Sequence, residues 1–404
     1  MPDLLYLADF NMEPRPQLSF EDTSVAFSYK SDIELKKANF IFSVVNHPSI
    51  SKLATASVKV AFGIGLPIKG IIKTTAFDHF CGGETIEEAE ETIQNLAKFG
   101  VSTILDYSVE GEETEAGFDK TTDETLLTIE KAHRSKHIPF CVFKMTGLAA
   151  VALLEKIQAK EKLTSEEEVA FERAKDRVNR ICAKAAEYKI PILVDAEETW
   201  IQEPVDELAY AMMEKYNRTE AIVFNTYQLY RTASLQNIKD AYAAADRGNY
   251  FVGAKVVRGA YMEKERARAE KFGYPSPIQP TKEASDEAFN SAIEFCVDKR
   301  DRISVMCGSH NEYSNLTLAQ LMDKHNISHH DKRFWFAQLY GMSDNISFNL
   351  AKAGYNVAKY VPYGPVKSVM PYLFRRANEN TSVAGQSSRE LILIRKELKR
   401  RKKG

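Results

Sequence analysis

Short apolar runs rich in β-branched and aromatic residues alternate with amphipathic segments between residues 101 and 361. Each run has the length of a buried strand, and the segments between them repeat apolar residues at helical spacing. Strands that alternate with helices are typical of parallel sheets, because a parallel pair needs a crossover connection. The expected strands are 101–107, 140–144, 192–195, 221–225, 251–257, 303–307, 334–338 and 357–361.

Eight strand and helix units in one chain predict a distorted (β/α)₈ barrel of the TIM type, in the α/β class. The alternative is an open, doubly wound sheet, whose usual GxGxxG motif after the first strand is absent. Ser31 with Glu34 forms a capping box that predicts a helix before the barrel. We therefore expect an N-terminal helical arm at 1–70, the barrel at 71–390, and a basic C-terminal tail at 391–404.

Composition narrows the class of protein. The 404 residues are 44% hydrophobic and 27% charged, which is ordinary for a globular chain. The net charge of -2 argues against nucleic-acid binding. Five cysteines without a CxxC pair argue against a disulfide framework. Because we find neither a signal-peptide pattern nor a long apolar span, we expect a cytoplasmic location.

Polar side chains follow every expected strand. The carboxyl ends of barrel strands carry the active site in this fold. A single pair such as Lys144 and Asp195 is equally consistent with a structural ion pair, but convergence of all eight strand ends favours a site. The strand-end residues include Asp106, Glu110, Lys144, Asp195, Glu197, Glu198, Gln228, Lys255, Arg258, Ser309, His310, Gln338 and Leu339.

Arg375 and Arg376 follow the last strand. Arginine suits a carboxylate, because its planar fork donates two parallel hydrogen bonds. An isolated arginine pair is usually solvated, yet the apolar residues 372–374 immediately before it indicate partial burial. The chain has no HExxH zinc motif, P-loop or GxSxG motif, so we predict no metal. An organic cofactor or simple acid–base chemistry remains.

Six groups of residues together resemble the proline dehydrogenase family, in the same order over roughly residues 70–385. The resemblance is closer to the stand-alone, mitochondrial-type enzymes than to the domain of bifunctional bacterial proteins. The groups are Phe143-Lys144, Asp195-Ala196-Glu197, Arg258-Gly259-Ala260-Tyr261, Ser309-His310-Asn311, Tyr363-Gly364-Pro365, and Tyr372-Leu373-Phe374-Arg375-Arg376 with Glu379-Asn380.

The resemblance implies non-covalent FAD, oxidation of L-proline to Δ¹-pyrroline-5-carboxylate, and a quinone as electron acceptor. By the same resemblance Arg375, Arg376 and Lys144 hold the proline carboxylate, and Asp195 orients Lys144. Glu110 pairs with Arg375 and closes the site. The residues implied to surround the ring are Tyr261, Leu339, Tyr363 and Tyr372. Those implied to contact FAD are Gln228, Lys255, Val257, Arg258, Gly259, Ala260, Ser309, His310 and Glu379.

Two residues depart from the bifunctional bacterial pattern. Lys255 stands where those enzymes carry arginine, and Met262 where they carry tryptophan. Lysine is a flexible point charge where arginine is a planar fork, and this difference bears on the flavin contacts and potential at that position.

Two other functions remain open. Hydroxyproline dehydrogenase shares the fold, but we expect Tyr363 to leave little room for a ring hydroxyl. A non-catalytic amino-acid-binding barrel is disfavoured by the intact set of site residues.

The C-terminal tail is strongly basic. The simpler interpretation is a solvated, frayed helix end. The functional alternative is a peripheral contact with the inner face of an anionic membrane, to which each basic residue contributes roughly 1 kcal/mol.

Overall fold

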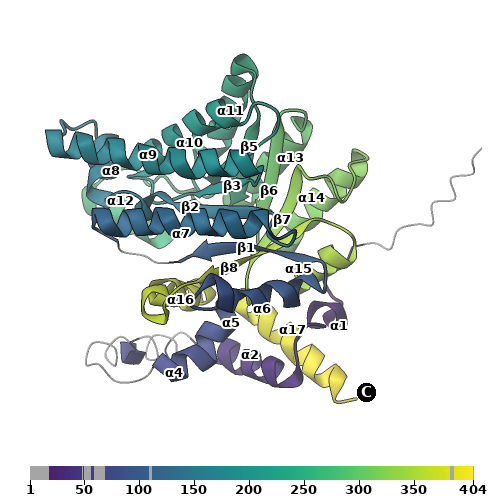
Figure 1. Ribbon diagram of the computed structural model, residues 1–404. Coiled ribbons are helices and arrows are strands. Elements are labelled where there is room, and N and C mark those ends of the chain that lie inside the picture. Colours follow the sequence, from purple (N-terminus) through teal and green to yellow (C-terminus); the bar gives the residue numbers. More distant parts are fainter. Residues whose placement is uncertain are drawn as a thin grey trace, which may run out of the picture.

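The computed structural model describes residues 18–47, 49, 56–58, 69–108, 112–382 and 386–403. Its centre is a closed barrel of eight parallel strands in chain order (Figure 1). The expected (β/α)₈ fold is confirmed. The strands are β1 (Val101–Tyr107), β2 (Phe140–Lys144), β3 (Ile192–Asp195), β4 (Val223–Gln228), β5 (Val252–Val257), β6 (Ile303–Gly308), β7 (Phe334–Leu339) and β8 (Val357–Tyr363).

Helices surround the barrel as crossover connections. α6 precedes β1, and its N-cap Thr85 accepts a hydrogen bond from the main-chain N–H of Glu88. The helices are α6 (Ile86–Ala97), α7 (Glu115–His133), α8 (Val151–Gln158), α9 (Ser165–Tyr188), α10 (Gln202–Tyr216), α11 (Ser234–Gly248), α12 (Met262–Phe272), α13 (Lys282–Asp298), α14 (Glu312–Lys324), α15 (Asp344–Lys352) and α16 (Val366–Ser382).

Alternation along β8 shows how the two sides of the barrel wall are built. Ala358 and Tyr360 join the apolar cluster inside the barrel. Val357, Val361 and Tyr363 join the cluster between the barrel and its outer helices. Successive strand residues point to opposite faces, so an odd-numbered separation places two side chains on opposite sides of the wall.

Several strands extend further than the sequence predicts. β4 begins at Val223 and continues to Gln228, β7 reaches Leu339, and β8 reaches Tyr363. At 221–222 the chain is instead bound by Asn217, whose side-chain oxygen accepts from Ile222 and Val223. The strand ends carry polar residues that face the barrel mouth, which weakens the apolar signal.

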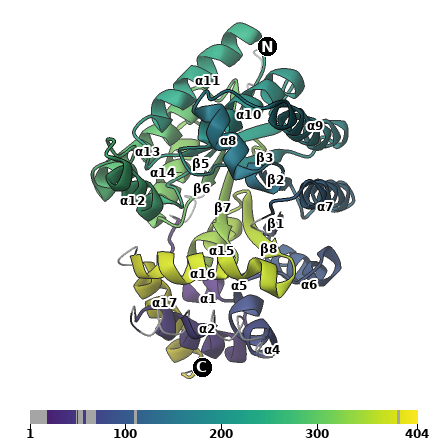
Figure 2. The ribbon, with the colours of Figure 1, turned by 90° about the vertical axis from the view of Figure 1, so that its left-hand side faces the viewer.

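A further layer of terminal helices covers one side of the barrel. Figure 2 shows α16 between the barrel and this layer. The layer contains α1 (Thr23–Ala26), α2 (Asp32–Val45), α4 (Lys69–Ile72), a π-helical turn (Lys73–Phe77), α5 (Asp78–Phe80) and α17 (Gln386–Arg401). The expected capping box of Ser31 and Glu34 begins α2.

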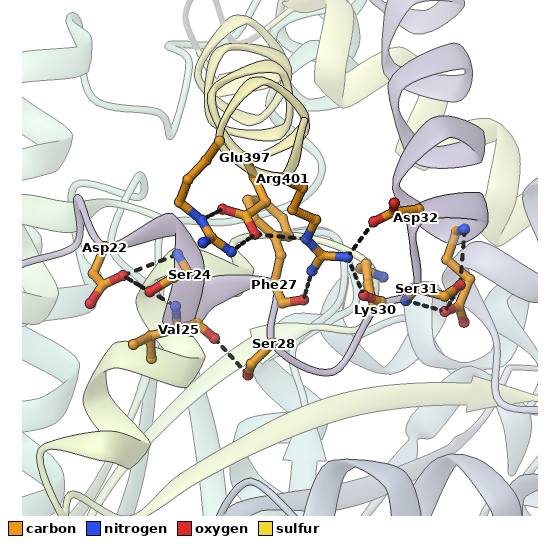
Figure 3. A network of polar contacts seen from close by, with 12 residues as sticks. Asp22, Ser24, Val25, Phe27, Ser28, Lys30, Ser31, Asp32, Glu397 and Arg401 are labelled. Carbon is orange, nitrogen blue, oxygen red and sulfur yellow. Dashed lines mark hydrogen bonds and ion pairs between the residues drawn. The ribbon is translucent and has the colours of Figure 1, made fainter. Parts of the chain in front are cut away.

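The basic tail is not a solvated, frayed end. It forms most of α17, which packs against α2. Arg401 donates to the carbonyl oxygens of Phe27 and Lys30 and pairs with Asp32 at 2.8 Å (Figure 3). Glu397 is fully buried and accepts a hydrogen bond from Arg401, one helical turn further along α17. Within the described residues, no helix is long and apolar enough to cross a membrane.

Candidate active site

A cavity of about 640 Å³ opens where the strands end. Its walls include Lys144, Asp195, Gln228, Val257 and Leu339, which are the last residues of β2, β3, β4, β5 and β7. The volume lies within the range of small-molecule and cofactor sites, roughly 300–1,000 Å³. The strand ends therefore converge on one site, as the barrel fold predicts.

Two lysines and two aspartates occupy the centre of the cavity. Lys255, only 6% exposed, binds Asp195 at 2.5 Å. Lys144 lies 3.4 Å from Asp195 and 3.5 Å from Asp106. Burial would raise the pKa of Asp195, but attraction from Lys255 and Lys144 outweighs it, so the pKa is lowered. The pKa of Lys255 is lowered by burial, which Asp195 only partly offsets.

The hydroxyl of Tyr360 joins these lysines and aspartates. Lys255 donates to its hydroxyl oxygen at 2.6 Å, and the hydroxyl donates to Asp195 at 3.4 Å. The lysine ammonium also lies 4.3 Å from the centre of the tyrosine ring. Asp195 thus lies closer to Lys255 than to Lys144.

The connection after β5 forms one wall of the cavity. Arg258 is fixed by Asp286 at 2.6 Å and by the hydroxyls of Ser309 and Ser314. Gly259 has φ 135, and a Cβ there would overlap the ring of Tyr230. Only glycine lets the backbone pass at this point. The adjacent main-chain N–H, of Ala260, donates to the Gln228 side chain.

α16 contributes the arginine pair. Tyr372, Arg375 and Arg376 all line the cavity, at the i, i+3 and i+4 positions of one helical face. The guanidinium carbon of Arg376 lies 5.1 Å from the ring centre of Tyr372, a cation–π distance. Arg376 is buried, so the pair is not the solvated type that is common on surfaces.

Two neutral polar groups complete the wall. Burial, with the nearby cations, lowers the pKa of His310 to about 3, so its ring is neutral at pH 7. Its Nδ1 lies 2.9 Å from the Ser343 hydroxyl. The Thr226 hydroxyl is buried on the cavity wall and has no hydrogen-bond partner among the described residues.

Comparison with known proteins identifies the family. A sequence profile described as "Proline dehydrogenase" matches residues 89–389. The chain belongs to the proline dehydrogenase family. The match runs from within α6 to the first residues of α17 and contains all of the cavity elements just described.

Individual relatives are similar to this chain over most of its length. The carbapenem biosynthesis protein CarD of Pectobacterium carotovorum is 36% identical over 80% of this chain and 83% of its own length. Proline dehydrogenase 1, mitochondrial, of Dictyostelium discoideum is 31% identical over 94% of this chain and 74% of its own. Hydroxyproline dehydrogenase of Xenopus laevis is 30% identical over 95% of this chain and 90% of its own length.

Solved structures agree on the fold. Proline utilization A from Bdellovibrio bacteriovorus superimposes with a TM-score of 0.70 at 21% identity. The superposition covers 89% of this chain and 38% of that one.

The Dictyostelium and Arabidopsis relatives are named mitochondrial, which contradicts the expected cytoplasmic location.

The cavity brings together most residues that the family resemblance suggested. Their roles toward substrate and cofactor remain predictions. Those that line it are Lys144, Asp195, Gln228, Lys255, Val257, Arg258, Gly259, Ala260, Tyr261, Ser309, His310, Leu339, Tyr372, Arg375 and Arg376.

The position of Tyr363 corrects the prediction that it surrounds the substrate ring. It is fully buried on the outer side of β8, where its hydroxyl contacts Thr128 and Glu124 of α7 at 3.0 Å. It does not reach the cavity, so it cannot surround a substrate ring there. Tyr360 occupies the cavity side of the same strand. Glu110 lies outside the described residues, as does the side chain of Glu379.

Asp106, which the sequence places at the end of the first strand, lines the cavity as expected. The structure adds Thr226, Tyr360 and Met342 to the expected site. No sequence pattern singles out Thr226 or Tyr360, since the side of the wall that each faces does not show in the sequence, and Met342 lies in the turn after β7.

Proposed function

We propose that this chain oxidises L-proline to Δ¹-pyrroline-5-carboxylate with non-covalently bound FAD and passes the electrons to a quinone. The observation that carries the proposal is the placement of Lys144, Arg375 and Arg376 around one cavity in a proline dehydrogenase family barrel. Three cations suit a small carboxylate substrate.

The donor set on the other wall fits FAD. The Thr226 hydroxyl is buried without a partner among the described residues, and a ligand hydrogen bond would satisfy it. Gly259 carries no side chain and its backbone passes the ring of Tyr230 on the cavity wall, and His310 is neutral, with Nδ1 2.9 Å from the Ser343 hydroxyl. We assign FAD to Gln228, Lys255, Val257, Arg258, Gly259, Ala260, Ser309 and His310, and expect Glu379 to join them. When bound, FAD accepts the hydride that leaves the ring carbon next to nitrogen.

The chain's own task is to position the substrate. The carboxylate clamp acts far from the reacting carbon, so its binding energy fixes the orientation of the ring. Proline must also release an ammonium proton before oxidation. Nearby cations lower the pKa of that ammonium group, so the clamp favours the neutral amine without a dedicated base. Tyr261, Leu339, Tyr360 and Tyr372 offer the apolar walls for the ring.

A spectrum of the purified protein tests the proposal. We expect a visible flavin band that bleaches when L-proline is added without oxygen and returns when a soluble quinone analogue is added. Arg376→Met should abolish bleaching by proline while the flavin stays bound. Arg180→Met, on the outer helix α9, is the matched control and should behave like the wild type. A colourless protein that reduces no dye with proline would instead indicate an amino-acid-binding barrel.

Hydroxyproline oxidation is a second candidate, since one relative of similar length carries that name. Tyr360 rather than Tyr363 bears on this choice, because its ring lies on the cavity side and its hydroxyl is held by Lys255. We expect kcat/KM for trans-4-hydroxy-L-proline to be much lower than for L-proline. Tyr360→Ser should narrow the difference; equal values in the wild type would contradict our assignment of the substrate.

A further inference from the structure

The turn after β7 forms part of the cavity wall. Leu339 and Met342, near the two ends of this turn, line the cavity. Gly341 has φ 77 and Ser343 has φ 51, so two of its residues adopt the left-handed conformation. That conformation costs a serine free energy unless the surrounding structure holds it in place.

Three buried side chains from three different elements hold this turn. His79 of α5 donates through Nε2 to the carbonyl oxygen of Gly341 at 3.1 Å. Lys359 of β8 donates to the carbonyl oxygen of Met342. Glu390 of α17 accepts a hydrogen bond from the main-chain N–H of Ser343. The polar main-chain groups of the turn are thus bound by α5, the outer face of β8, and the C-terminal helix.

Four ionisable groups meet in this cluster. Lys359 binds Asp344 at 2.9 Å, and Lys30 lies 3.7 Å from the same carboxylate. Burial would raise the pKa of Asp344, but Lys359 and Lys30 lower it to about 2. Glu390 is the fourth group, and burial raises its pKa to about 7. Its carboxyl oxygen accepts from Ser343 in either protonation state.

Ser343 connects this cluster to the cavity. Its N–H is held by Glu390, and its hydroxyl lies 2.9 Å from Nδ1 of His310. His310 lines the cavity. A shift of the Ser343 backbone therefore moves the hydroxyl that orients the imidazole ring. The family match ends at residue 389, one residue before the glutamate.

We propose that Glu390 is a positioning residue for the cofactor side of the cavity, acting through Ser343 to fix the ring of His310. The functional consequence rests on the proposed binding of FAD at His310. The positioning itself can be measured in protein without flavin. Glu390 touches neither substrate nor cofactor in this scheme.

The test compares two glutamates of the same helix. Glu390→Ala should change the side-chain ¹⁵N chemical shifts of His310 in flavin-free protein. It should also weaken FAD binding about tenfold, which corresponds to loss of one oriented hydrogen bond. Glu390→Gln should restore both, because its amide oxygen can accept from Ser343. Glu397→Ala should lower the unfolding temperature yet leave both readouts unchanged, since Glu397 binds Arg400 and Arg401.

The outcomes distinguish failure of the positioning role of Glu390 from failure of the proposed function. Unchanged His310 shifts in Glu390→Ala would overturn the inference, as would equal weakening of FAD binding by Glu397→Ala. Changed shifts in a protein that binds no FAD would support the positioning and refute the proposed function. If Glu390→Ala does not fold, Ser343→Gly removes the hydroxyl and suits the left-handed backbone. The same His310 shift is expected there, and its absence overturns the inference.

Discussion

Two buried lysines of the barrel wall have similar surroundings but lie on opposite sides of it. Lys255 of β5 pairs with Asp195 and with the hydroxyl of Tyr360 inside the barrel. Lys359 of β8 pairs with Asp344 on the outside, and that aspartate accepts from the hydroxyl of Tyr29. Each pair is thus accompanied by a tyrosine.

The difference lies in what else surrounds each pair. Lys255 borders the cavity, and its aspartate is shared with Lys144. Lys359 is fully buried between β8, α15 and the terminal helices, and it holds the turn beside the cavity. Burial and an ion pair therefore do not by themselves distinguish a functional lysine from a structural one. We propose that the side of the strand and access to the cavity do.

The largest stability effect is expected from the outer pair. Lys359→Met leaves Asp344 buried with only Lys30, 3.7 Å away, as a cation. Breaking a buried ion pair in this way costs about 3–5 kcal/mol. Guanidinium denaturation followed by tryptophan fluorescence would measure the loss of unfolding free energy. Adding Asp344→Leu should recover much of it, and a single variant as stable as the wild type would refute the structural role.

For the inner pair we expect a smaller loss of stability and a larger loss of activity than for the outer pair. In Lys255→Met, Asp195 keeps Lys144 at 3.4 Å, so we expect a loss of unfolding free energy below that of Lys359→Met. We expect kcat/KM for proline to fall about a hundredfold, because a fixed charge beside the reacting groups is lost. Steady-state kinetics with unfolding curves on both variants would show this. Intact activity with lost stability would mean that both lysines are structural.

The comparison also shows where sequence reasoning succeeds. The barrel was predictable because strands such as 101–107 and 140–144 are short, largely apolar runs that alternate with helical segments. The side of the barrel wall that each strand residue faces was not predictable. All seven residues of β8 are buried, so no alternation of polarity shows which face is inside. Tyr360 and Tyr363 differ by three positions, which places them on opposite sides of the wall.

The terminal layer was hidden for another reason. The charge run of α17 has the composition of a solvated helix, yet Glu397 within it is fully buried. Its stabilising contacts come from the other end of the chain. Arg401 reaches the carbonyl oxygen of Lys30 across 371 sequence positions. A local pattern cannot reveal a partner at that separation, whereas local capping signals such as Ser31 with Glu34 predicted α2 correctly.

Two buried carboxyl groups, one in each region, have a pKa raised to about 7. Burial does this to Glu390 on the outside, where Asp344 opposes its ionisation and Lys359 and Lys30 favour it. Burial does the same to Glu197 in the connection after β3, where the main-chain N–H of Thr146 and Lys144 favour ionisation and Glu198 opposes it. A raised folded-state pKa stabilises the fold below the unfolded value of 4.5, and this contribution is lost as pH rises through 7.

We therefore expect each of the two glutamates to lower the unfolding free energy by about 1–3 kcal/mol between pH 5 and 7.5. His79 and His310 contribute in the opposite direction, because their pKa in the folded protein is lowered from 6.5 to about 3. Denaturation at several pH values would measure the slope. Glu390→Gln and Glu197→Gln should each remove the contribution of its own carboxyl group, so that the unfolding free energy falls less, or rises more, with pH than in the wild type. If Glu390→Gln leaves the slope unchanged, its carboxyl group ionises in the folded protein as it does in the unfolded chain. Asp344, with a pKa of about 2, does not titrate in this window.

The smallest effect sharpens the distinction between the two faces of β8. Tyr363→Phe loses the hydroxyl contacts with Thr128 and Glu124, which should cost about 0.5–1.5 kcal/mol of unfolding free energy. Its kcat/KM for proline should stay near that of the wild type. Tyr360→Phe, the matched change on the cavity side, deprives Lys255 of an acceptor and should lower kcat/KM instead. A larger loss of activity in Tyr363→Phe than in Tyr360→Phe would show that the outer tyrosine, and not the inner one, governs the site.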